Sequence, residues 1–174
     1  SFPYIIKPVD SSGSKGVTKI ESNKDNLNKA IDLAFEFSIS NKIIIESFMT
    51  GVEYTVEVFI VKSQLNILAI TKKNKVSGTK GTVASDLITP RISSKLFAKI
   101  ERIITNSFLS LNYNNGPGHA EIILSNNENI GVVEVAGRGG GFMVFDKLVP
   151  YASGINIAKL SILQATGNIT LKDG

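Results

Sequence analysis

The sequence predicts an α+β protein built from antiparallel strand pairs and amphipathic helices, and three patterns support this prediction. Short β-prone runs are separated by turns rich in glycine, serine or asparagine, which is typical of hairpins. Residues 22–40 and 93–111 instead carry apolar residues at helical spacing. Near the C-terminal third, 118–125 and 130–136 are two strands joined by one polar turn. The 174 residues suit one domain or two small lobes that share a core.

The N-terminal strands are predicted to form a hairpin. Residues 2–7 are apolar and β-prone and end before Pro8, and 17–21 form the second strand. The glycine- and serine-rich turn between them, residues 10–16, offers N–H groups and hydroxyls that can wrap phosphate oxygens. An ordinary flexible turn is the alternative. The spacing does not match a Walker A loop.

The next elements are a helix and three strands. Ser22 and Asp25 resemble a capping box in front of a helix that should end near residue 40 and pack on a sheet. A buried strand is expected at 42–47. The alternating run 53–61 places Glu53, Thr55 and Glu57 on one face. A further strand follows at 65–71.

Residues 72–90 are rich in lysine, glycine, serine and threonine without a clear period, so they are predicted to form a mobile loop near the site. The short basic run 72–75 is interpreted as part of this solvated loop. The helix at 93–111 then buries one apolar stripe, formed by Leu96, Phe97, Ile100, Ile103, Ile104, Phe108 and Leu111. One or two helices, at 142–151 and 155–166, close the chain.

The most informative feature is the hairpin of 118–125 and 130–136. With a four-residue turn, Glu121 falls directly opposite Glu134, and like charges in that position are destabilising. A hard divalent cation such as Mg²⁺ would remove this repulsion, because it prefers carboxylate oxygens and often binds substrate phosphates as well. Arg138 follows within a glycine-rich segment, where the bare backbone lets a ligand approach closely. His119 shares the face of Glu121 and could approach the metal or the substrate, but as a lone histidine it is interpreted as structural and is left out of the site.

Composition narrows the classes of function. The net charge of +4 and pI of about 9.2 favour an anionic ligand, whereas scattered basic residues argue against nucleic acid. The absence of cysteine excludes thiolate chemistry and disulfides. No apolar run approaches the length of a membrane span, so no membrane partner is expected, and a cytoplasmic location is the default. The first residue is Ser, and a strand follows almost at once, so a piece of a longer chain is expected.

Taken together, these segments resemble the ATP-grasp superfamily over nearly the whole chain. The resemblance rests on Lys7-Pro8 before the 10–16 turn, on Glu46 followed by Gly51-x-Glu53, on Glu121, and on Glu134-x-x-x-Arg138 with trailing glycines. The resemblance implies two α+β lobes, 1–51 and 52–174, with antiparallel sheets that grip Mg-ATP. The ending of the hairpin is most similar to the carboxylate-amine ligase branch. A preceding domain of the same chain would help to bind the acid and the amine.

The resemblance also implies a role for each site residue. Lys7 would contact the ATP phosphates, and Ser12, Ser14 and Gly16 lie in the turn that would cover them. Adenine would be read by Glu46 and by the backbone of Ser47 and Met49. The ribose would be held by Glu53, Mg²⁺ (or Mn²⁺) by Glu121 and Glu134, and the transferring phosphoryl group by Arg138.

Three of these residues also fit roles that involve no ligand. Lys7 also fits a surface lysine at a strand end, Glu53 a solvated acid and Arg138 a loop ion pair. One departure from the family pattern concerns the residue two positions after Glu134, which is often Asn in the family and is Ala136 here. This departure and the missing preceding domain leave a nucleotide-binding module without chemistry as one alternative. A domain that phosphorylates bicarbonate, of the carbamoyl-phosphate synthase or biotin carboxylase type, is a second alternative.

Overall fold

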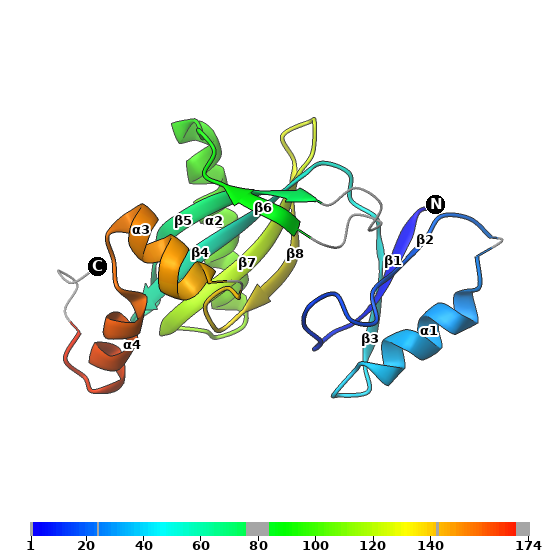
Figure 1. Cartoon of the computed structure of the whole chain (residues 1–174), viewed down its shortest axis with the longest axis horizontal. Coiled ribbons are helices and arrows are strands. Elements are labelled where there is room, and N and C mark those ends of the chain that lie inside the picture. The colour runs from blue at the N-terminus through cyan, green and yellow to red at the C-terminus, as the bar shows by residue number, and fades with distance from the viewer. Residues whose placement is uncertain (1, 24, 76–83, 142, 170–174) are drawn as a thin grey trace. The chain divides into compact units, whose positions relative to one another are not determined.

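A computed structural model of the chain describes residues 2–23, 25–75, 84–141 and 143–169 (Figure 1). The described residues form two compact units, one within 1–50 and the other comprising 51–75 and the described part of 84–174. The first unit combines an antiparallel sheet with one helix and the second unit combines one with several helices, so the predicted α+β class is confirmed.

The first unit is a three-stranded antiparallel sheet covered by one helix. Its strands are β1 (Tyr4–Pro8), β2 (Thr18–Ile20) and β3 (Ile43–Ser47), in the order β2-β1-β3. Helix α1 (Leu27–Glu36) packs Ala30 and Ala34 against Ile6 and Ile20, and these four residues form the core of the unit. The predicted hairpin, helix and third strand are all present.

The ends of α1 differ from the sequence prediction. Asn26 caps the helix, because its Oδ1 accepts a 3.0 Å hydrogen bond from the Lys29 backbone N–H. The Asp25 carboxylate closes the preceding turn instead, accepting from the backbone N–H of Ser22 at 3.1 Å. The helix ends at Glu36, and Asp10 binds the non-helical segment that follows by accepting from the backbone N–H of Ser40 at 2.6 Å.

The second unit contains a five-stranded antiparallel sheet in the order β6-β5-β4-β7-β8 (Figure 1). Its strands are β4 (Val52–Val61), β5 (Gln64–Lys75), β6 (Ala84–Ile88), β7 (Gly116–Leu124) and β8 (Ile130–Ala136). Strand β5 runs through Lys75 and β6 begins at Ala84, so the loop predicted for 72–90 is wrong at both ends. Its central part, residues 76–83, lies outside the described residues.

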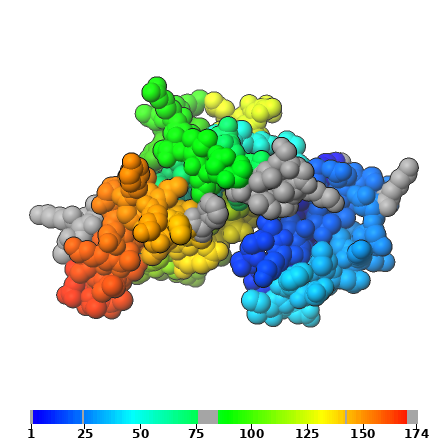
Figure 2. Space-filling view, viewed as in Figure 1, coloured from blue at the N-terminus to red at the C-terminus, as the bar shows by residue number. Residues whose placement is uncertain are grey.

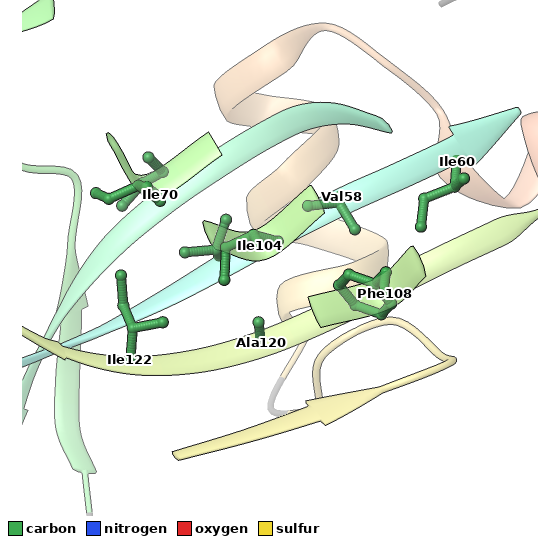
Figure 3. Packing of buried hydrophobic residues seen from close by; sticks show 9 residues of the cluster. Val58, Ile60, Ile70, Ile104, Phe108, Ala120 and Ile122 are labelled. Atoms are coloured by element: carbon green, nitrogen blue, oxygen red, sulfur yellow. The ribbon is translucent and has the colours of Figure 1, made fainter. Parts of the chain in front are cut away.

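Helix α2 (Ser94–Ser110) covers one face of this sheet and provides its main core (Figure 3). Ile100, Ile104 and Phe108 are at most 2% exposed. They pack against β4, β5 and β7 through Val56, Val58, Ile60, Ile70, Ala120 and Ile122. Phe97 and Leu111, which were expected in the buried stripe, are 39% and 62% exposed because they lie at the edge of the contact.

The other face is covered by the C-terminal helices. A π-helical turn, η1 (Val144–Leu148), leads into α3 (Val149–Ser153) and α4 (Ile157–Ala165), which form the orange-to-red surface in Figure 2. Val144, Val149 and Ile157 pack on Phe59 and Val61 of β4. The predicted closing helices are thus present, although Phe142 lies outside the described residues. None of the helices among the described residues is long and apolar enough to cross a membrane.

Candidate metal and nucleotide site

The β7–β8 hairpin brings Glu121 opposite Glu134, as predicted, but by a different route. The predicted register placed Ile123 opposite Val132, whereas Ile123 lies opposite Gly131 and the turn is one residue longer. A β-bulge between Glu121 and Ile122 restores the Glu121–Glu134 pair. The two deviations cancel, so the prediction of opposed carboxylates is confirmed although the predicted turn is wrong.

The two carboxylates sit in different electrostatic surroundings. Glu134 is exposed, but partial loss of solvent and the charge of Glu121 raise its pKa. Burial alone would raise the pKa of Glu121 as well, but interactions with His119 and Lys73 lower it to about 2. Glu121 is therefore ionised at neutral pH, and the repulsion between the two carboxylates contributes to the raised pKa of Glu134.

Lys73 of β5 is the principal cation beside these acids. Its Nζ lies 2.7 Å from Glu53 Oε1 and 2.7 Å from Glu121 Oε1, and the lysine side chain is only 15% exposed. Burial lowers the pKa of Lys73, but the two carboxylates outweigh this and raise it. Glu53 also binds Lys75 at 2.6 Å. The ammonium of Lys73 thus joins the acid predicted for ribose to an acid predicted for metal.

A second buried group lies on the other side of Glu121. His119 Nδ1 hydrogen-bonds to Oε1 of Glu57, and the backbone N–H of Gly140 donates to Oε2 of Glu57 at 3.0 Å. Glu57 is 1% exposed and His119 is 7% exposed. Burial would lower the pKa of His119, but interactions with the carboxylates of Glu121 and Glu57 raise it to about 9.

Potential metal ligands converge at this point. Among the described residues, His119, Glu121 and Glu134 each offer one ligand atom, and these atoms lie within 4.8 Å of one another. Two carboxylates that repel one another, one of them with a raised pKa, are a donor set that a divalent cation stabilises. The residues predicted for metal binding therefore fit a cation, and His119, interpreted as structural from the sequence, lies with them.

The glycine-rich segment after β8 carries Arg138. Arg138 is exposed, and its Nη1 donates to the carbonyl of Gly139 at 3.0 Å. The segment packs closely on the Glu57–His119 pair at Gly140, where a Cβ would lie 2.6 Å from Glu57 Oε1 and 3.0 Å from His119 Nδ1. Only glycine allows this approach of the backbone to the buried pair.

The other predicted residues lie in the first unit. Lys7 forms a 2.6 Å ion pair with Glu46 across β1 and β3, so these two residues are brought together. Ser12 and Ser14 are exposed on the turn between β1 and β2. Gly16 is buried in a left-handed conformation, and a Cβ there would lie 2.9 Å from Pro8 Cγ.

The predicted adenine-reading segment follows β3. Ser47 ends that strand and is exposed, and Met49 is half-buried. Sequence reasoning missed Lys73 and the pairing of Glu57 with His119. The signal for Glu57 was present, because Glu53 and Glu57 share one face of a predicted strand. Lys73 was missed because it lies in the polar run 72–75, which was assigned to a loop although it forms the end of β5.

Comparison with known proteins identifies the family. Residues 1–146 match the family model of the ATP-grasp domain. The chain is also 33% identical over 155 residues to a D-alanine–D-alanine ligase of Buchnera aphidicola, covering 87% of this chain and 49% of that protein. A second such ligase, from Flavobacterium johnsoniae, is 32% identical over 73% of this chain and 40% of its own length. The chain belongs to the ATP-grasp family, and it spans about half the length of these relatives or less.

Solved structures show the same fold. An L-amino acid ligase from Bacillus licheniformis superposes with a TM-score of 0.79 at 23% identity, over 100% of this chain and 41% of that one. A D-Ala:D-Ser ligase from Enterococcus faecalis gives 0.74 at 22% identity, over 97% and 50%. A biotin carboxylase from Campylobacter jejuni gives 0.80 at 17% identity, over 99% and 39%. These similarities concern the fold alone and confirm the expected ATP-grasp architecture.

Proposed function

We propose that this chain is the ATP- and metal-binding part of a ligase that uses ATP to activate a carboxylate for attack by an amine. The observation that carries the proposal is the opposition of Glu121 and Glu134, which creates a repulsion that a metal-nucleotide ligand relieves. Membership of the ATP-grasp family and the similarity to D-alanine–D-alanine ligases support this reaction class.

Glu121 and Glu134 would hold Mg²⁺ or Mn²⁺. The bound cation would supply positive charge that neutralises the ATP phosphates. Loss of solvent and the charge of Glu121 together raise the pKa of Glu134, so a bound cation would favour the ionised form of Glu134. With Ala136 in place of an amide side chain, a single cation is the simpler assignment.

Each unit would contribute residues that bind the nucleotide. In the first unit, Lys7 and the turn that contains Ser12, Ser14 and Gly16 are proposed for the phosphates. The adenine residues there are Glu46 and the backbone of Ser47 and Met49. In the second unit, Glu53 is proposed for the ribose hydroxyls, where its ion pairs with Lys73 and Lys75 fix the position of its carboxylate.

The chemistry would proceed in two displacements. A carboxylate oxygen of the substrate attacks the γ-phosphorus, the bond to the β,γ-bridging oxygen breaks, and ADP leaves. An amine then attacks the carbonyl carbon of the acyl phosphate, the C–O bond to phosphate breaks, and the nitrogen loses a proton. Such transfers need positioning and charge neutralisation more than a protein nucleophile. The planar guanidinium of Arg138 suits the transferring phosphoryl oxygens.

The relatives suggest the class of substrate. Because they are D-alanine–D-alanine ligases, we propose an amino acid as the carboxylate and a second amino acid as the amine. Bicarbonate as the phosphorylated acid is the second candidate. It is suggested by the similarity in fold to a biotin carboxylase.

The experiment is an ADP-release assay on the full-length protein with D-alanine, with other amino acids, and with bicarbonate. We expect release that depends on an amino acid, together with a hydroxamate when hydroxylamine traps the acyl phosphate. Bicarbonate-dependent release would select the second candidate. If the protein binds nucleotide but releases no ADP under any condition, the alternative of a nucleotide-binding module without chemistry would be selected. As a variant test, Arg138→Lys should reduce turnover much more than ATP affinity, because a point charge replaces a fork.

A further inference from the structure

We propose that His119 is a third ligand of the metal, binding it through Nε2, and that Glu57 is the positioning residue that aims this nitrogen. This inference rests on the proposed function, because it concerns the cation that Glu121 and Glu134 would hold. It adds a nitrogen donor to a site that sequence reasoning limited to two carboxylates.

The orientation of the imidazole points Nε2 toward the site. Nδ1 is engaged by Glu57 Oε1, so only Nε2 is left to face the site. Nε2 lies 3.7 Å from Glu121 Oε1, which is beyond hydrogen-bonding distance. Two ligands of one cation lie between about 3 and 4.2 Å apart, since each metal–ligand bond is about 2.0–2.2 Å long, and the separation of Nε2 and Oε1 falls within this range. The histidine is therefore directed toward Glu121 at ion-pair distance rather than at hydrogen-bonding distance.

Burial holds the imidazole in this orientation. The His119 side chain is 9% exposed and that of Glu57 is 1% exposed, so the imidazole cannot swing into solvent. A metal-binding histidine usually gives its other nitrogen to a carboxylate, which fixes the ring and makes the free nitrogen more basic. The Glu57–His119 pair has this arrangement.

Glu57 also serves a second part of the site. Its other oxygen accepts the Gly140 N–H at 3.0 Å, so one buried carboxylate fixes both the ring of His119 and the segment that carries Arg138. A site with one nitrogen and two oxygen donors should prefer Mn²⁺ or Co²⁺ over Mg²⁺ more strongly than a site of carboxylates alone, because imidazole suits transition metals.

The test exploits the fact that His119 is the only histidine of the chain. The protein is labelled with ¹⁵N-histidine, loaded with Mn²⁺ and ADP, and examined by pulsed electron paramagnetic resonance. We expect the strong ¹⁵N coupling of a directly bound imidazole. Bound Mn²⁺ without this coupling would overturn the inference and leave the proposed function standing. Failure of Mn²⁺ to bind at all would overturn both.

Affinities provide the second readout. His119→Gln should weaken Mn²⁺ binding by about 10–100-fold, and Mg²⁺ binding by less, so the preference for Mn²⁺ shrinks. Glu57→Gln should act in the same direction and reduce the ¹⁵N coupling while His119 is still present. The control is Ser107→Ala, which removes a hydroxyl from α2 on the opposite face of the sheet from Glu57, His119 and Glu121. Equal losses for Mn²⁺ and Mg²⁺ in His119→Gln would contradict a nitrogen ligand.

Discussion

Replacing Lys73 by methionine should destabilise the second unit when no metal is present. Lys73 binds Glu53 and Glu121 at 2.7 Å each and is 15% exposed. Glu53 keeps Lys75, whereas the cation left nearest Glu121 among the described ion pairs is His119, whose Nε2 is 3.7 Å away. Breaking a buried pair costs about 3–5 kcal/mol, and the residual exposure of Glu121 lowers our expectation to about 2–3 kcal/mol.

A divalent cation should recover part of this loss, because it neutralises the carboxylate that Lys73 leaves behind. At saturating Mn²⁺ we expect the difference between wild type and Lys73→Met to shrink by at least about 1 kcal/mol, the linkage expected of tighter metal binding. Methionine keeps most of the length of the side chain, so packing changes little.

The assay is urea unfolding followed by circular dichroism, with hydrogen exchange of residues 116–124 assigning the transition to the second unit. Lys75→Met is the control, because Lys75 has a 38% exposed side chain and an ion pair with Glu53, so its loss should cost less than about 1 kcal/mol. The proposed role of Lys73 is refuted if Lys73→Met costs no more than Lys75→Met, or if Mn²⁺ stabilises Lys73→Met no more than wild type.

Three more predictions concern the glycine-rich segment after β8, Glu134 of β8, and Asp10 of the first unit. Gly140→Ala should lower the free energy of unfolding in urea by about 1–3 kcal/mol through overpacking. Gly141→Ala should lower it much less, because no described atom lies within 4 Å of the position that a Cβ would take there. Equal losses in the two variants would contradict the close approach at Gly140. Glu134→Gln should raise metal-free stability by up to about 1 kcal/mol, measured by the same method, and a loss of stability would argue against repulsion. Hydrogen bonds with Ser40 lower the pKa of Asp10 in the folded protein, so Asp10 stabilises the fold above its unfolded-state pKa and this stabilisation is lost as pH falls through the folded-state pKa. Asp10→Asn should therefore be less stable than wild type at pH 7 and should approach wild type in acid. Thermal unfolding over a series of pH values would check this.

Much of the fold follows from local patterns in the sequence. Residues 93–111 formed the expected helix because Ser93 caps it and Ile100, Ile104 and Phe108 recur on one face. The β7–β8 hairpin followed from two β-prone runs around a polar turn. Its register did not, since a β-bulge near Glu121 depends on how β8 meets β7 rather than on a local residue preference.

The site was partly predictable for a related reason. Glu121 and Glu134 are close in sequence, so a single turn fixes their separation. Lys73 reaches them from β5, and Glu57 reaches His119 from β4, through strand pairings that span many residues. Alternation along one strand identifies a face but not the side chain across from it. Lys73 also sits in a basic run whose composition is typical of a loop, and here the tertiary pairing overrode that preference.

Titration calorimetry with ADP, in Mg²⁺ and again in EDTA, tests the central claim most directly. The claim is that nucleotide and cation share one site built around Glu121 and Glu134. We predict micromolar ADP binding in Mg²⁺, marked weakening in EDTA, and loss of the Mg²⁺ effect in Glu134→Ala. The same ADP affinity in Mg²⁺ and EDTA, or an undiminished Mg²⁺ effect in folded Glu134→Ala, would contradict it.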